Sequence, residues 1–155
     1  ISHETVGDGD RLALFVHGIL GRGRNWRTIA RKLAARSAGW RAMLIDLRNH
    51  GDSPPLPGPH DLSACAADLQ RIFQESGEPS ILVGHSFGGK VVLRWALDRA
   101  TDGEVFVLDC PLSARPCRGE PTHPDDPRYI VAVLRAALRS DPVPRPLPPW
   151  RFASP

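Results

Sequence analysis

The sequence predicts an α/β fold in which helices cover both faces of a mostly parallel sheet, and two observations support this prediction. Four short apolar runs do not alternate with polar residues, which is typical of strands buried on both faces of a parallel sheet. Helical patterns separate these runs, so strand and helix alternate along the chain, as they do where helices connect parallel strands. The four runs are Leu12–Val16, Ala42–Leu47, Ile81–Val83 and Val105–Leu108.

The helices are predicted from apolar residues that recur every three or four positions. Three helices lie between the strands, and a fourth lies beyond the last strand. In the second, Asp61 is a suitable N-cap and Gly77 a suitable stop. The four stripes are Trp26, Ile29, Ala30, Leu33 and Ala34; Leu62, Cys65, Ala66, Leu69, Ile72 and Phe73; Val91, Val92, Trp95 and Ala96; and Ile130, Val133, Leu134, Ala137 and Leu138.

The length of 155 residues is that of one ordinary domain, with a core that needs no metal or disulfide to be stable. Most of the 16 prolines follow residue 110. We therefore expect a compact alternating unit at residues 1–110 and a Pro-rich extension with one helix at residues 111–155.

Composition excludes several classes of protein. Apolar residues make up 41% and charged residues 24%, which is a globular composition. The balance of 20 basic against 17 acidic residues is too mild to indicate nucleic-acid binding. No apolar run approaches the roughly 20 residues that a membrane span needs. Three cysteines are too few, and odd in number, for a disulfide framework. This predicts a reducing compartment, either the cytoplasm or an organelle matrix.

The segment Gly84-His85-Ser86-Phe87-Gly88 has the pattern G-x-S-x-G between a predicted strand and a predicted helix, the setting of a nucleophile elbow. The turn holds the serine in a strained conformation, and the two glycines remove side chains that would collide. Ser86 is therefore the candidate nucleophile. The alternative interpretation is a tight glycine turn with an ordinary serine.

A second glycine-rich turn, His17-Gly18-Ile19-Leu20-Gly21, follows the first predicted strand. Acyl transfer needs backbone N–H donors for the oxyanion, and we expect those of Ile19 and Phe87 to supply them. We interpret His17 as a hydrogen-bonded residue that fixes this loop. A third segment, from Asp46 to Ser53, is polar and follows the second predicted strand. By itself, this segment could be any polar loop between a strand and a helix.

Together, the three segments resemble the α/β-hydrolase superfamily over roughly residues 5–110. The residues within the three segments resemble those of the small bacterial esterases and the mitochondrial abhydrolase-type serine hydrolases. The resemblance implies an α/β-hydrolase fold and a serine hydrolase that cleaves a small carboxylic ester or thioester through an acyl-enzyme at Ser86, with no metal or organic cofactor. It also implies oxyanion donors at Ile19 and Phe87. Asp109 would be the acid of the triad or, alternatively, a strand-end residue that caps the following loop.

The sequence departs from the superfamily pattern in lacking the late strands and the catalytic histidine. None of its six histidines has the expected position, although His123 lies in the extension, which resembles the start of a cap subdomain. We expect His85 to point away from Ser86. The chain is either the N-terminal part of a hydrolase or a catalytically inactive binding or interaction protein. The edge strand Val105–Leu108 is expected to pair with another strand, from the same polypeptide, a partner chain or an oligomer.

Overall fold

The computed structural model describes residues 1–99 and 101–110. These residues form a five-stranded sheet in the order β1-β3-β2-β4-β5. Strand β1 pairs antiparallel with β3, and the other neighbouring strands are parallel. The predicted fold class, a mostly parallel α/β sheet, is therefore confirmed. The strands are β1 (His3–Val6), β2 (Arg11–Val16), β3 (Trp40–Ile45), β4 (Ile81–His85) and β5 (Glu104–Leu108).

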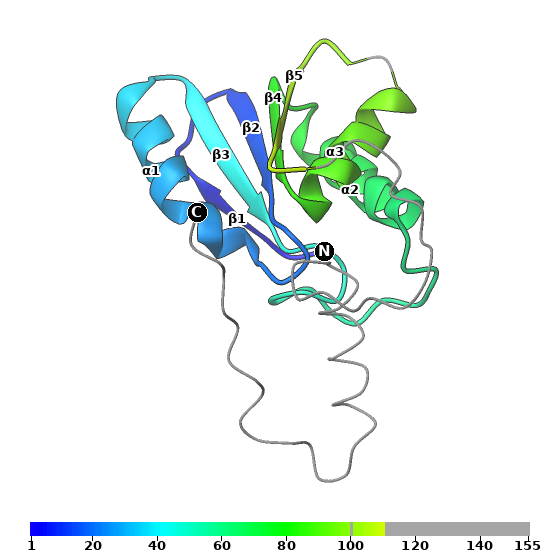
Figure 1. The fold of residues 1–155 in the computed structure, drawn as a ribbon. Coiled ribbons are helices and arrows are strands. Elements are labelled where there is room, and N and C mark those ends of the chain that lie inside the picture. Colours follow the sequence, from blue (N-terminus) through cyan, green and yellow to red (C-terminus); the bar gives the residue numbers. More distant parts are fainter. Residues whose placement is uncertain (100, 111–155) are drawn as a thin grey trace, which may run out of the picture. The chain divides into compact units, whose positions relative to one another are not determined.

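Helices cover both faces of this sheet. Figure 1 shows α1 (Arg27–Arg36) on one face and α2 (Leu62–Ser76) with α3 (Phe87–Leu97) on the other. Strand β2 contributes to both cores: Leu12, Leu14 and Val16 belong to the cluster that includes α2 and α3, whereas Ala13 and Phe15 belong to the cluster that includes α1. Burial on both faces explains why this run is continuously apolar.

The predicted ends of α2 are confirmed. The carboxylate of Asp61 accepts a hydrogen bond from the Ala64 N–H at 2.8 Å, which satisfies one free donor of the first turn. Gly77 ends the helix with a φ of 85°, a conformation that glycine adopts without steric cost.

The first predicted helix differs from the structure at its beginning. A short 3-10 turn, η1 (Gly23–Trp26), precedes α1, so Trp26 lies before the α-helix. Ala30 is fully buried against the sheet, but Ile29 is 50% exposed. The apolar stripe predicted for this helix therefore included one residue too many on its buried face. The side chain of Ile29 lines a cavity instead of packing on the sheet.

Strand β1 was not predicted from the sequence. Its residues alternate between exposed and half-buried, and it lies at the edge of the sheet, where it pairs with β3. A four-residue segment that contains His3 and Glu4 has no apolar run to reveal it.

Residue 100 and residues 111–155 lie outside the described part of the chain. The chain divides into two units, Ile1–Ala114 and Arg115–Pro155, and every described residue belongs to the first. The helix predicted around Ile130–Leu138, the cap subdomain and His123 all lie outside the described residues, and the boundary at residue 110 stays a prediction. None of the helices in the described part combines the length and the apolar character needed to cross a bilayer.

Candidate active site

The candidate site lies at one edge of the sheet. His17, Asp46, Ser86 and Asp109 each directly follow the last residue of a strand, namely β2, β3, β4 and β5. Because these four strands are parallel, their carboxyl ends meet at the same edge, where α/β proteins bind ligands. The topology thus gathers the segments that the sequence singled out.

Ser86 occupies the sharp turn between β4 and α3. Its backbone angles are φ 51° and ψ −114°, a region that residues other than glycine rarely adopt. A Cβ atom at Gly84 would collide with the backbone of Gly88, so the turn tolerates no side chain there. The N–H of Ser86 donates to the Leu108 carbonyl at 2.9 Å, which ties the turn to β5. The strained turn expected from the sequence is present.

The loop after β2 packs directly against this turn. A Cβ atom at Gly88 would collide with the carbonyl oxygen of His17. A Cβ atom at Gly18 would lie 3.0 Å from Nδ1 of His85 and 3.4 Å from Cβ of Ser86. Glycine at these two positions therefore allows the loop and the elbow to approach one another closely.

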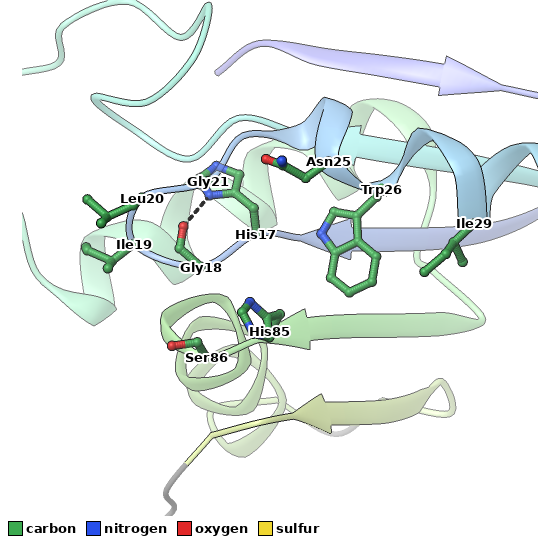
Figure 2. A pocket seen from close by; sticks show the side chains of 10 residues that line it. All are labelled: His17, Gly18, Ile19, Leu20, Gly21, Asn25, Trp26, Ile29, His85 and Ser86. Carbon is green, nitrogen blue, oxygen red and sulfur yellow. Dashed lines mark hydrogen bonds between the residues drawn. The ribbon is translucent and has the colours of Figure 1, made fainter. Parts of the chain in front are cut away.

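A cavity of about 480 Å³ opens between the elbow, the loop after β2 and the start of α1. Figure 2 shows Ile19 and Leu20 on the loop, Trp26 and Ile29 on the α1 side and Ser86 on the elbow; all five line the cavity. Its walls are thus largely apolar. The indole Nε1 of Trp26 is buried without a hydrogen-bond partner among the described residues. The sequence assigned Trp26 and Ile29 to a core stripe and missed their place at this cavity.

His17 fixes the loop, as its interpretation from the sequence proposed. Its Nδ1 donates to the Gly18 carbonyl at 2.7 Å, and its Nε2 accepts from the Leu47 N–H at 3.1 Å, an arrangement that requires a neutral ring. Burial lowers the pKa of His17. The hydrogen bond to Gly18 opposes this effect, and the nearby His50 adds to it. Both ring nitrogens are occupied, so His17 is not available as a general base.

Asp46 joins two loops to the sheet. Its carboxylate accepts from the Gly23 N–H at 2.6 Å and from the Asp52 N–H at 2.8 Å. Ser53 donates its hydroxyl to the Asp46 carbonyl at 2.6 Å and accepts from the Ser2 N–H at 2.8 Å. The polar groups of this segment therefore have a structural role, in which Asp46 orders the two loops.

Arg48 anchors the same segment from its other side. Its guanidinium makes two hydrogen bonds to the carboxylate of Asp68, at 2.7 and 2.9 Å, and a third to the Pro59 carbonyl. Both side chains are buried, at 9% and 3% exposure. The bond to Asp68 raises the pKa of Arg48 above its usual value. The ion pair fastens the loop after β3 to α2.

Asp109 lies beside His85. Its carboxylate is 3.7 Å from Nε2 of His85, its side chain is 92% exposed and its φ is 45°. Figure 2 shows the His85 and Ser86 side chains leaving the chain in different directions, yet both line the cavity. Among the hydrogen bonds of the described residues, none joins a histidine to the hydroxyl of Ser86. In the same residues no group of three or more His, Cys, Asp or Glu could hold a metal ion.

The model of the alpha/beta hydrolase fold family matches residues 13–132. The chain belongs to this family. It is 40% identical over 105 residues to the sn-1-specific diacylglycerol lipase ABHD11 of Mus musculus, a match that covers 65% of the chain and 34% of that relative. It is 34% identical over 142 residues to the protein of the same name from Danio rerio, covering 90% of the chain and 42% of the relative. The chain thus spans less than half the length of these relatives.

Solved structures give the same family. A marine microorganism esterase superposes with a TM-score of 0.69 at 26% identity, over 87% of the chain and 50% of the esterase. The thioesterase domain from the curacin biosynthetic pathway superposes with a TM-score of 0.67 at 28% identity, over 89% of the chain and 48% of that domain. This α/β-hydrolase chain therefore resembles about half of each enzyme.

Proposed function

We propose that this α/β-hydrolase chain carries the nucleophile of a serine hydrolase that cleaves a carboxylic ester or thioester. The observation that carries the proposal is the strained backbone of Ser86, at φ 51° and ψ −114°, on the wall of the cavity. Backbone strain of this kind destabilises the folded state, and it persists mainly at functional sites. The names of the relatives, which are lipases, esterases and a thioesterase, support the same class of substrate.

In the proposed reaction, the oxygen of Ser86 attacks the acyl carbonyl carbon while a histidine takes the hydroxyl proton. The N–H groups of Ile19 and Phe87 stabilise the oxyanion, and the free N–H groups at the start of α3 favour negative charge there. The histidine returns its proton to the leaving alcohol or thiol, which leaves an acyl-enzyme. Water then attacks the acyl carbon in the same manner and releases the carboxylic acid. Asp109 is the proposed acid that orients the histidine.

The cavity supports an apolar acyl group as the part of the substrate that enters. Its volume of about 480 Å³ is in the usual range for small-molecule sites, and Ile19, Leu20, Trp26 and Ile29 line it. An acyl chain there would bury apolar surface beside Ser86 at roughly 0.8 kcal/mol for each CH₂ group.

A binding or interaction protein without catalysis is the second candidate, favoured by the lack of a histidine bonded to Ser86 among the described residues. Hydrolysis of p-nitrophenyl esters by the full-length protein and by Ser86→Ala distinguishes the two. The proposal expects a loss of several orders of magnitude, as for a triad nucleophile. Equal activity of the two proteins would refute it, and a wild-type protein without activity would favour the binding protein. Ser80→Ala is a matched control, because Ser80 lies at the opposite end of β4.

A further inference from the structure

The imidazole of His50 bridges two loops of the candidate site. Its Nδ1 lies 2.8 Å from the carbonyl oxygen of Arg48, and its Nε2 lies 2.5 Å from the carbonyl oxygen of Ile19. A carbonyl oxygen only accepts hydrogen bonds, so each ring nitrogen that makes its contact must donate. The ring therefore ties the loop after β3 to the loop after β2, which is 31 residues away from it in the sequence.

The tie acts on the residue proposed as an oxyanion donor. The carbonyl of Gly18 accepts from Nδ1 of His17 at 2.7 Å and from the Gly21 N–H at 2.8 Å. Because the peptide bond is planar and trans, holding the Gly18 carbonyl sets the direction of the Ile19 N–H. His50 holds the next carbonyl, that of Ile19. The peptide planes on both sides of the Ile19 Cα atom are thus fixed by imidazole rings.

The backbone that carries His50 is held in place by hydrogen bonds on both sides of the residue. Its own N–H donates to the Leu47 carbonyl at 3.0 Å, and its carbonyl accepts from the Ser53 N–H at 3.0 Å. Arg48, whose carbonyl oxygen lies 2.8 Å from Nδ1 of His50, is held by its buried ion pair with Asp68. His17 contacts His50 with ring centroids 5.1 Å apart, but its own nitrogens are occupied, so it cannot replace His50 at the Ile19 carbonyl.

We propose that His50 is a positioning residue that holds the peptide plane after Ile19, through its Nε2–H bond to the Ile19 carbonyl, and so keeps the Ile19 backbone in the conformation that directs its N–H toward the oxyanion. This inference rests on the proposed serine-hydrolase function. An oxyanion donor acts mainly in the transition state, so its orientation governs kcat more than KM. Small misplacements of reacting groups are costly, and removal of the tie should lower kcat by roughly 10- to 100-fold.

The test compares His50→Ala, His50→Gln and His50→Asn in the full-length protein with p-nitrophenyl esters. The amide nitrogen of glutamine is at the position of Nε2 and can still donate to Ile19, whereas that of asparagine is at the position of Nδ1 and reaches only toward Arg48. We expect kcat to fall in the alanine and asparagine variants, with KM within about twofold. The glutamine variant should recover most of the loss.

His60→Ala is the matched control, because His60 lies on the same loop and is exposed. If the alanine variant does not fold, the glutamine and asparagine variants carry the comparison. Wild-type kcat in both of these, or an equal loss in both, would overturn the role of His50 while leaving Ser86-dependent activity in place. A wild-type protein without Ser86-dependent hydrolysis would instead overturn the proposed function, and this inference with it.

Discussion

Replacing Ser86 by glycine is expected to make the protein more stable than replacing it by alanine, although both variants lose the hydroxyl. The reason is the positive φ of 51°, at which a Cβ atom is strained and a glycine is not. Both variants lack the Ser86 hydroxyl, so its loss affects them equally. Their difference in free energy of unfolding therefore reports the strain stored at the elbow, reduced by the greater freedom of glycine in the unfolded chain.

The size of this difference follows from two opposing effects. A residue other than glycine in such a backbone region costs about 1–3 kcal/mol in the folded state. Glycine loses part of this advantage, because its unfolded chain is freer by about 0.4–1 kcal/mol. The glycine variant should therefore be more stable than the alanine variant by ~1 kcal/mol.

Urea unfolding of both variants, followed by circular dichroism, measures the difference. Gly77→Ala is the matched control, because Gly77 has a φ of 85° and a Cβ atom added there meets nothing within 4 Å. It should lose ~1 kcal/mol from backbone strain alone. If Gly77→Ala loses this stability while the two Ser86 variants unfold at the same urea concentration, the backbone at the elbow is not strained and the reasoning fails.

Asp109→Asn should leave the fold intact and lower ester turnover by up to about 10⁴-fold if Asp109 orients the histidine; near-normal kcat would assign the acid elsewhere. Asp68→Ala should cost ~3–5 kcal/mol in urea unfolding, because it leaves the Arg48 guanidinium buried and unpaired, whereas Arg48→Met with Asp68→Leu should be close to neutral. Equal losses in the single and double variants would contradict this. The pKa of His17 is lowered from 6.5 in the folded protein, so the unfolded chain binds a proton at this residue more readily. The stability that the neutral ring contributes is therefore fully present above that pH and is lost as the pH falls below it. His17→Gln should flatten this decline in the urea midpoint, and an unchanged slope would argue against a buried neutral ring.

The sheet was largely predictable because burial on both faces leaves a continuous apolar run, as in β2 and β3. Strand β1 was missed because its four residues, His3 to Val6, contain no apolar run. The ends of α2 were predictable because capping acts within a few residues, between Asp61 and Ala64.

The candidate site was predictable where its chemistry is local. The two glycines of the elbow and the serine between them lie within five residues, and their spacing alone indicates the turn. The contact of His50 with Ile19 and the apolar wall at Trp26 and Ile29 depend on how distant segments meet in space. No local spacing reveals such contacts. The sequence therefore indicated the candidate nucleophile but not the contact that holds the Ile19 loop or the apolar wall of the cavity.

The hydrogen bonds of Ser2 bear on how the protein is best produced. Its N–H donates to the hydroxyl of Ser53, and its carbonyl accepts from the Asp46 N–H at 2.9 Å. Residues ahead of β1 thus brace the loop that carries His50. An expression boundary placed after Ser2, or a bulky tag fused directly at that point, would remove or crowd this brace.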